Sequence, residues 1–146
     1  MMLEKMKALA KAKDTCVLAT VSGGIPHCSL MAYVINEDCT EIFMVTHRQT
    51  TKYRNLNENP AVSLLVDTRE EHTGPLRPKA SAMTIDGTFE HISDEQRRRA
   101  AHSLLLIRHP HLLEFLDHPD SEIFCIRVSS FLLLEGITDA YYEELK

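Results

Sequence analysis

A repeated alternation of short apolar runs and turns constrains this chain more than any other feature of its sequence. Six such runs occur, at residues 15–21, 26–35, 41–46, 61–67, 79–90 and 122–135. Ser22-Gly23-Gly24 separates the first two runs, and a polar turn at residues 36–38 separates the second from the third. Apolar, β-branched runs joined by such short turns are typical of antiparallel hairpins. We therefore predict six strands, beginning with two hairpins in succession.

Helical segments are predicted at four points along the chain. They cover residues 2–12, residues 49–59, a stretch that follows Ser93, and residues 110–116. Thr50 is the expected N-cap of the second helix, and Pro60 ends it because a helical residue before proline is sterically disfavoured. Ser93 and Gln96 are expected to form a capping box at the start of the third helix.

The connecting segments complete the predicted architecture. Residues 69–78 are expected to form a charged loop, Gly87 a bulge or bend within its strand, and the residues after 135 a polar tail. Strands that cluster early and are joined by short turns favour a mainly β (α+β) fold, an antiparallel barrel with flanking helices, over a parallel βαβ sheet. The length of 146 residues and the lack of a linker sequence indicate one domain, residues 1–146.

Charge and hydropathy argue against several classes of partner. The formal net charge of −5 makes generic binding to nucleic acid or to an anionic membrane unfavourable. No apolar run approaches the length that spans a bilayer, and residues 1–7 are charged and amphipathic, so we expect no signal peptide and a cytoplasmic location. The four cysteines form no CxxC pair and are expected to be buried free thiols. They are Cys16, Cys28, Cys39 and Cys125.

The segment Thr46-His47-Arg48-Gln49-Thr50-Thr51-Lys52 has the composition of a phosphate site. It leaves a predicted strand and enters a predicted helix, whose first turn offers free backbone N–H groups and a positive dipole end. Hydroxyl and basic side chains are added to these donors, and no acidic residue occurs between Glu41 and Glu58. The alternative from the pattern alone is a solvated basic helix start.

The predicted strand at residues 26–35 has two unlike faces. Its small apolar face comprises Cys28, Leu30, Ala32 and Val34. Its mixed face comprises His27, Ser29, Met31 and Tyr33. We expect the apolar face to line the barrel interior. A mixed face is suited to a ligand, a partner subunit or an overlying helix, and the pattern alone does not choose among them.

No catalytic residue or metal site is predicted from motifs. His109, His111 and His118 gather around two prolines, but no second Cys or His pair completes a regular zinc spacing. The motifs GxSxG, Walker A and GxGxxG are absent. We therefore leave the catalytic residues unassigned and expect no metal.

Three segments together resemble the pyridoxamine 5′-phosphate oxidase-like FMN-binding split-barrel superfamily. They are residues 18–27 (LATVSGGIPH), residues 41–67 (EIFMVTHRQTTKYRNLNENPAVSLLVD) and the strand that ends in Asp86-Gly87-Thr88. The most specific part of the resemblance runs from Thr46 through Asn59-Pro60 to Val66. It comprises the end of a strand, a helix start, an Asn-Pro break and a second β-rich run. The resemblance implies a six-stranded antiparallel split β-barrel with flanking helices, which forms a homodimer and holds FMN at the dimer interface.

The resemblance also implies roles for individual residues. Ser29, Leu30 and Met31 would line the isoalloxazine ring of FMN. Thr46 would lie near the ring or the ribityl chain. The phosphate would be held by Thr50, Thr51 and Lys52, with Arg48 supplying a further charge.

Departures from the family pattern limit the activity that is implied. The vitamin B6 oxidases have arginines at the positions of Ser29 and Thr51, and a glutamine at the position of Ala82. Their C-terminal arginine and histidine motif is absent from residues 137–142. We expect an FMN-dependent oxidoreductase of unknown substrate and not a true pyridoxamine phosphate oxidase.

Three alternatives stay open. The chain could be a non-catalytic flavin-binding or electron-transfer protein, or a split barrel that binds haem or a deazaflavin. The histidines at 109–118 are the candidate haem ligands. His27 and Tyr33 are candidate proton-transfer groups, with simple packing or a dimer contact as the alternative.

Overall fold

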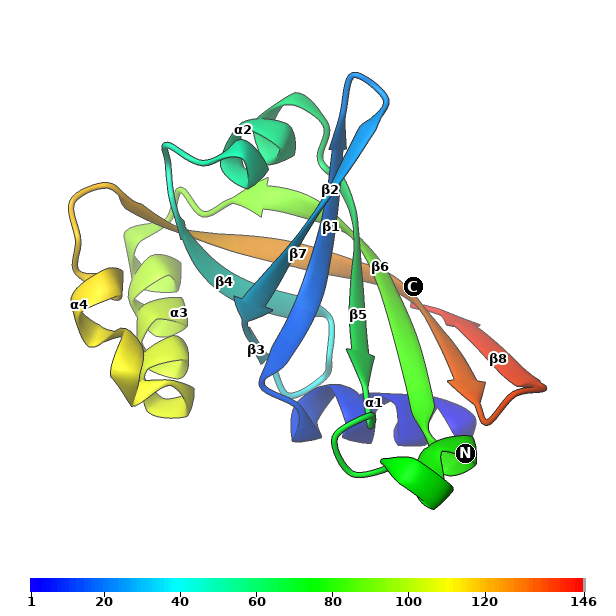
Figure 1. Ribbon diagram of the computed structural model, residues 1–146. Coiled ribbons are helices and arrows are strands. Elements are labelled where there is room, and N and C mark those ends of the chain that lie inside the picture. Colours follow the sequence, from blue (N-terminus) through cyan, green and yellow to red (C-terminus); the bar gives the residue numbers. More distant parts are fainter. Residues whose placement is uncertain (146) are drawn as a thin grey trace.

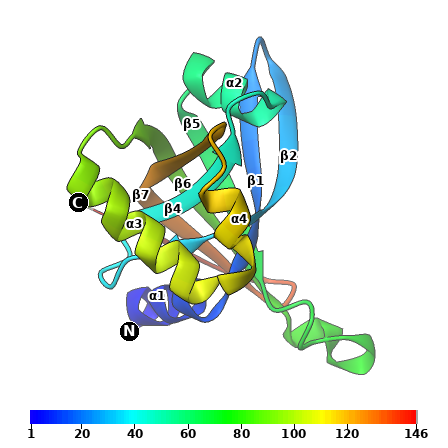
Figure 2. The ribbon, with the colours of Figure 1, turned by 90° about the vertical axis from the view of Figure 1, so that its left-hand side faces the viewer.

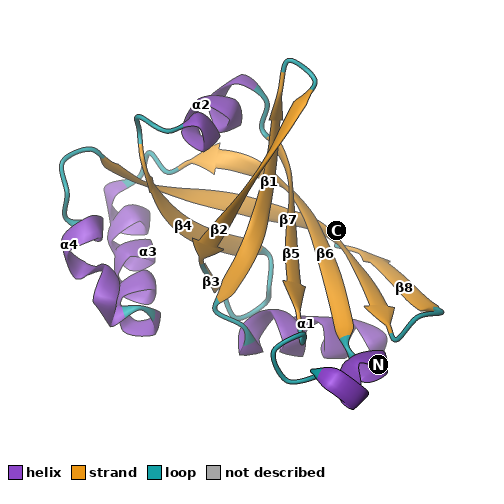
Figure 3. Cartoon of the chain, in the orientation of Figure 1, coloured by secondary structure: helices purple, strands orange, loops and turns teal. Residues whose placement is uncertain are grey.

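The computed structural model describes residues 1–145, which form one curled antiparallel sheet with helices around it (Figures 1 and 3). The strands are β1 (Thr15–Ser22), β2 (Ile25–Ala32), β3 (Val34–Ile35), β4 (Glu41–His47), β5 (Ala61–Asp67), β6 (Ser81–His91), β7 (Ser121–Glu135) and β8 (Asp139–Glu144). The helices are α1 (Met2–Ala12), α2 (Thr51–Glu58), α3 (Glu95–Arg108) and α4 (Leu113–Leu116), with 3-10 turns η1 (Gly74–Lys79) and η2 (Pro110–Leu112). The strand order is β2-β1-β5-β6-β7-β4-β3, and β8 pairs with β7.

The mainly β barrel with flanking helices is confirmed, but the predicted count of six strands is wrong. The sheet has eight strands because one predicted run is divided and one strand was missed. The run at residues 26–35 divides at Tyr33, whose N–H donates to the Asp14 carbonyl 3.0 Å away instead of to a strand partner. The segment expected to be a polar tail forms β8, in which Tyr141 pairs with Leu133. Its acidic composition concealed this pairing.

The β1–β2 hairpin closes with two glycines, as its sequence predicts. Ser22 pairs with Ile25, and the two residues between them, Gly23 and Gly24, have φ values of 59° and 77°. Positive φ at both central positions is the turn geometry that matches the twist of the flanking strands. The long hairpin places β2 at the edge of the sheet.

The predicted orientation of β2 is wrong. Met31 is 6% exposed and belongs to the core, whereas Leu30 is 75% exposed and Cys28 lies on the surface. The hairpin register causes this, because it pairs Met31 with the buried Cys16 and Leu30 with Val17. Side chains that face each other across a pair lie on the same side of the sheet, so the mixed face of β2 points inward. The apolar face points outward.

Two apolar clusters hold the fold together. The larger fills the concave side of the sheet and is closed at one end by Met6 and Ala10 of α1. The smaller lies under α3, where Ala101 and Leu105 pack against β4 and β7. Figure 2 shows α3 and α4 side by side over this part of the sheet. Because both faces are covered, β4 is buried continuously from Ile42 to Thr46.

The predicted irregularity at Gly87 is confirmed, but the extra residue belongs to the partner strand. The register of β6 with β7 shifts between Asp86 and Gly87, since Asp86 pairs with Ser130 and Gly87 with Val128, which leaves Ser129 of β7 as the bulged residue. A Cβ atom added at Gly87 would lie 2.6 Å from the carbonyl oxygen of Arg127 and 2.7 Å from Ile126 Cγ2. Close approach of two backbones therefore requires glycine at this position.

The predicted N-cap is confirmed for α2 and wrong for α3. Thr50 caps α2, and its side chain accepts a hydrogen bond from the Tyr53 N–H. Asp94, not Ser93, caps α3 by accepting from the Gln96 N–H at 3.0 Å. Aspartate caps helices as well as serine does, and Asp94 directly follows Ser93, so the sequence allows the helix to begin after either residue. Within residues 1–145, no helix is long and apolar enough to cross a membrane.

Candidate functional site

The predicted phosphate segment lies where β4 ends and α2 begins. Thr46 is 1% exposed, and its Oγ1 atom lies 3.5 Å from Thr50 Oγ1. The Thr50 hydroxyl donates to the His47 carbonyl at 3.0 Å and accepts from the Tyr53 N–H at 3.2 Å. The hydroxyls of Thr46 and Thr50 are thus brought together, and they fix the angle at which the chain enters the helix.

Two backbone donors remain at the start of α2. The first intrahelical hydrogen bond runs from the Arg54 N–H to the Thr50 carbonyl at 3.1 Å, and Thr50 caps Tyr53. The N–H groups of Thr51 and Lys52 precede that bond and have no helical acceptor. A helix start of this kind binds anions through N–H groups and the helix dipole.

Lys52 is the most informative side chain at this junction. It is half-buried, and burial lowers the pKa of its ammonium group. Within residues 1–145 it makes no ion pair and no side-chain hydrogen bond, and no nearby carboxylate offsets its desolvation. A cation held in this way gains a counter-charge when an anion binds beside it.

Arg48 is held by a different part of the chain. Its Nε atom lies 3.0 Å from Glu122 Oε1, and its Nη1 donates to the Pro119 carbonyl at 2.8 Å. Its backbone N–H donates to the Asp120 carbonyl at 2.9 Å. The guanidinium group is thus tied to the start of β7 and the residues just before it rather than to α2.

The helix α2 is anchored to β1 by polar and apolar contacts. Asn55 Nδ2 donates to Thr20 Oγ1 at 3.2 Å, and both residues are buried. Leu56 is fully buried in the main core. The phosphate segment is therefore mounted on a rigid element and not on a free loop.

The three predicted ring-contacting residues of β2 do not share a face. Ser29 is half-buried opposite Leu18, Met31 is in the core, and Leu30 projects outward. Their backbone is nevertheless accessible, because β2 is an edge strand paired only with β1. A ligand along β2 would meet the Leu30 side chain and the free strand edge.

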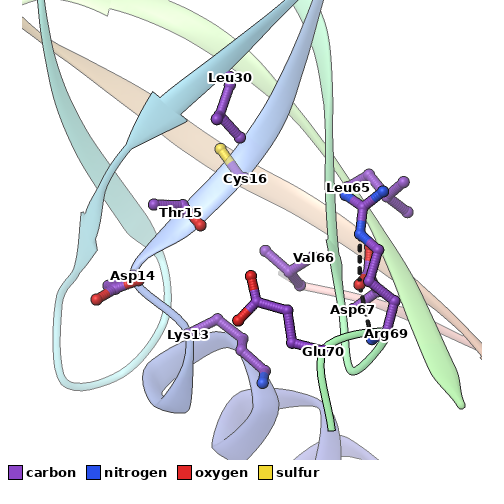
Figure 4. A pocket seen from close by; sticks show the side chains of 10 residues that line it. All are labelled: Lys13, Asp14, Thr15, Cys16, Leu30, Leu65, Val66, Asp67, Arg69 and Glu70. Atoms are coloured by element: carbon purple, nitrogen blue, oxygen red, sulfur yellow. Dashed lines mark hydrogen bonds and ion pairs between the residues drawn. The ribbon is translucent and has the colours of Figure 1, made fainter. Parts of the chain in front are cut away.

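A cavity of about 470 Å³ opens beside Leu30, where β1 and β5 diverge (Figure 4). The two strands pair only from Val17–Leu65 to Ala19–Ser63, so a gap forms beyond Val17. The cavity is lined by Lys13, Asp14, Thr15, Cys16, Leu30, Leu65, Val66, Asp67, Arg69 and Glu70. None of the predicted phosphate residues is among them.

The charges around this cavity are mostly paired. Arg69 Nε lies 3.1 Å from Asp67 Oδ1, and Lys13 contacts Glu71. In the part of the chain that the structure describes, Asp14 and Glu70 form no ion pair. Sequence reasoning missed these residues because they come from strand ends and a loop that carry no motif.

The candidate proton-transfer residues have different surroundings. The Tyr33 hydroxyl is buried and donates to the Ala10 carbonyl at 2.6 Å, and burial raises its pKa. Tyr33 thus packs α1 against the sheet, the alternative that the sequence left open. His27 is half-buried on the inward side of β2, opposite Thr20.

The candidate haem ligands do not converge on one point. His109 is 3% exposed, and its Nε2 lies 2.8 Å from the Tyr33 carbonyl. His111 is exposed, with its ring 5.8 Å from that of His109. His118 accepts the Asp120 N–H through Nδ1 at 3.0 Å. Among residues 1–145, no group of three or more His, Cys, Asp or Glu side chains is placed to hold a metal ion.

Comparisons with known proteins agree on the fold. The family model described as "Pyridoxamine 5'-phosphate oxidase" matches residues 2–133. No curated protein matches the sequence.

Several solved structures share the fold at low identity. A haem-binding protein from Mycobacterium smegmatis has a TM-score of 0.86 and 18% identity, covering 99% of this chain and 58% of its own. HutZ, a haem storage protein from Vibrio cholerae, has a TM-score of 0.68 and 20% identity, covering 96% and 91%. An FAD-binding protein from Mesorhizobium loti has a TM-score of 0.72 and 15% identity, covering 89% and 91%. The chain thus spans little more than half of the M. smegmatis protein.

Proposed function

The chain belongs to the pyridoxamine 5′-phosphate oxidase family, and from this premise we propose that it binds FMN at the β4–α2 junction and acts as an FMN-dependent oxidoreductase. The observation that carries the proposal is Lys52, a half-buried cation at a helix start to which residues 1–145 offer no counter-ion. The N–H groups of Thr51 and Lys52 and the hydroxyl of Thr51 surround it with further donors. An FMN phosphate is a dianion that matches this donor set.

The outer face of β2 supports a homodimer that covers the flavin ring. Pro26, Cys28 and Leu30 occupy alternate positions on this face and are all exposed, Leu30 by 75%. Apolar side chains grouped on an edge strand are typical of a surface that another chain covers. A second copy of this chain would close the ring site, because a two-fold contact uses the same face of both subunits.

The chemistry would be divided between cofactor and protein. The flavin, when bound, supplies the redox step, and the protein supplies binding, orientation and exclusion of water. Lys52 and the α2 start would orient the phosphate, and the edge of β2 would orient the ring. The cavity beside Leu30 would admit the substrate. Asp14 and Glu70, whose carboxylates form no ion pair within residues 1–145, would favour a substrate that donates hydrogen bonds.

The departures from the vitamin B6 oxidases set the proposed activity apart from theirs. Ser29, Thr51 and Ala82 replace two arginines and a glutamine of those enzymes. The C-terminal arginine and histidine motif, which the resemblance assigns to the substrate phosphate, is also absent from residues 137–142, so a substrate phosphate would lack those partners. We propose an oxidoreductase that acts on another substrate.

A visible absorbance spectrum tests the proposal directly. The purified protein is mixed with FMN, desalted and measured beside the Lys52→Ala variant and the control Lys79→Ala, which removes an exposed lysine of η1. We expect the wild type and the control to retain a flavin spectrum and Lys52→Ala to lose it. A wild-type protein that retains no FMN, or a Lys52→Ala variant that retains it fully, would contradict the proposed site.

Turnover separates an enzyme from a non-catalytic flavoprotein. The flavin-loaded protein is reduced with a nicotinamide or chemical donor and then mixed with air and with candidate acceptors. Reoxidation that a substrate accelerates supports the oxidoreductase. A reversible titration without any substrate effect would favour an electron-transfer or flavin-storing protein.

Haem is the second candidate ligand, because two structures that share the fold are haem proteins by name. His111 and His118 are both exposed, but His118 already accepts the Asp120 N–H, so His111 is the freer of the two to ligate iron. A Soret band that appears on haem addition and is lost in His111→Ala would support haem binding. Unchanged haem absorbance would close this candidate.

A further inference from the structure

A groove of about 530 Å³ lies between α3 and the connection from α4 to β7. It is lined by Arg48, Arg98, Arg99, His102, Ser103, Leu116, Asp117, His118, Pro119 and Ser121. It shares no residue with the cavity beside Leu30. Figure 2 shows α3 beside the segment that runs from α4 to the start of β7.

The charged groups of this groove are unbalanced. Three arginines line it, and Asp117 is its single carboxylate. Arg98 and Arg99 are held only loosely, since their nitrogen atoms lie 3.9 and 3.5 Å from the same Glu95 oxygen. Both guanidinium groups can therefore turn to a ligand without losing a strong ion pair.

The other polar groups of the groove are fixed in place. Arg48 is held by Glu122 and by the Pro119 carbonyl, and its second terminal nitrogen has no acceptor in the described part of the chain. His102 Nε2 lies 3.0 Å from Asp117 Oδ1, so the one carboxylate of the groove already has a partner. A rigid arginine on one wall and two adjustable arginines on the other can bracket an anion.

We propose that this groove binds a ligand with two or more linked phosphate groups. Arginine presents a planar fork of donors that matches phosphate oxygens in pairs. One phosphate would engage the pair at Arg98 and Arg99, and the next would engage Arg48. Ser103 and Ser121 add polar groups to the same walls.

This site is separate from the proposed FMN site but adjoins it along the chain. Arg48 precedes the α2 cap, Thr50, by two residues. The linked phosphates could therefore belong to a separate free ligand or to a flavin dinucleotide, in which the flavin phosphate is joined to a second phosphate. The chemistry recognised by the groove is the same in both cases, and only binding measurements distinguish the two sources.

Calorimetric titration with inorganic pyrophosphate at low ionic strength tests the proposal. The double variant Arg98→Gln/Arg99→Gln is compared with Arg77→Gln/Lys79→Gln, which removes the same charge from exposed positions in η1. We expect the first variant to bind pyrophosphate about tenfold more weakly or worse, and the control to bind like the wild type. Melting curves of both variants verify that they are folded.

Two results would overturn the proposal. One is a wild-type protein that does not bind pyrophosphate at millimolar concentration. The other is an equal loss of affinity in the groove variant and in the control, which would show a response to net charge alone. Neither result depends on whether the protein binds flavin.

A second titration identifies the source of the phosphates. FMN and FAD are each titrated into the wild type and into Arg98→Gln/Arg99→Gln. If the variant weakens FAD and leaves FMN unchanged, the groove holds the second phosphate of the cofactor. If it weakens neither flavin but does weaken pyrophosphate, the ligand is a separate molecule. Failure of both flavins to bind would overturn the proposed function and leave the pyrophosphate result standing.

Discussion

The Nε2 atom of His109 lies 2.8 Å from the carbonyl oxygen of Tyr33, and both residues are buried. A carbonyl oxygen can only accept, so His109 carries its proton on Nε2. This hydrogen bond ties the segment after α3 to the point where β2 gives way to β3. The finding assigns His109 to structure and makes it a poor ligand for haem iron through Nε2.

We expect His109→Ala to lower the free energy of unfolding by about 2–3 kcal/mol. The substitution leaves a cavity and removes the partner of a buried carbonyl. Urea denaturation measures the effect, and His111→Ala, at an exposed position, serves as the control with a change below about 0.5 kcal/mol. Equal stability of the two variants would contradict the structural role of His109.

The sequence predicts the fold well where local patterns decide it. The β1–β2 turn, the register shift at Gly87, the Thr50 cap and the bounds of β5 all follow from residue types that suit few conformations. Local patterns do not decide which face of β2 points inward, because both faces of this strand contain apolar side chains. The register with β1 makes that choice, and it depends on long-range pairing.

The candidate site shows the same division. The phosphate segment is recognisable because its donors are contiguous in sequence. The cavity beside Leu30 and the groove beneath α3 are assembled from segments distant in sequence. Only the folded chain brings Arg48 and Arg98 to one groove, so no motif could have indicated it.

Gly87→Ala should destabilise the protein by about 1–3 kcal/mol or more. The new methyl group would lie 2.6 Å from the Arg127 carbonyl, and two backbones would have to separate to admit it. Gly24→Ala is the useful comparison, because nothing lies within 4 Å of its Cβ position and only its positive φ is strained. That change should cost about 1 kcal/mol. A smaller loss for Gly87→Ala than for Gly24→Ala in urea denaturation would argue against the close approach.

Cys28 should be the one rapidly reactive thiol of the four cysteines in the native protein. It is exposed, whereas burial raises the pKa of both Cys16 and Cys125 to about 12. A chromogenic thiol reagent at neutral pH is expected to modify one thiol quickly in the wild type and none in Cys28→Ser. Rapid modification of a second thiol would show that the core around β1 or β7 opens readily.

The same burial predicts a loss of stability in alkali. The folded-state pKa of Cys16 lies above its unfolded-state pKa, so the folded protein favours the neutral thiol. The contribution of the buried neutral thiol to stability is therefore complete below the ordinary pKa of cysteine. That contribution is lost as the pH rises from there toward about 12. Cys16→Ala should reduce the slope of unfolding free energy against pH in this range. An unchanged slope would contradict the assignment.

Leu30→Lys should weaken the proposed homodimer. The substitution places a charge on the exposed apolar face of β2, where a second chain would bury it. Sedimentation velocity should show a dimer for the wild type and a monomer, or a dissociation at least about tenfold easier, for the variant. Ile137→Lys is the control, since Ile137 is 91% exposed in the turn between β7 and β8. A wild type that stays monomeric with FMN bound would refute the dimer.

FMN affinity should fall at alkaline pH, and Lys52 should set the pH at which it falls. Burial lowers the pKa of this lysine, so its charge is lost at a lower pH than that of an exposed lysine. A bound phosphate stabilises the charged form, and affinity therefore declines as the pH rises through the pKa of the free protein. Fluorescence titration of FMN from neutral pH upward measures this decline.

Lys52→Arg tests the cause, because a guanidinium group keeps its charge throughout that range. The variant should bind FMN with an affinity that changes little with pH, even if the different shape of arginine weakens binding at neutral pH. Lys79→Arg, on the exposed η1 turn, should leave the wild-type decline in place. A decline of equal size in Lys52→Arg would show that another group controls the pH dependence, and the assignment of the phosphate to Lys52 would lose its support.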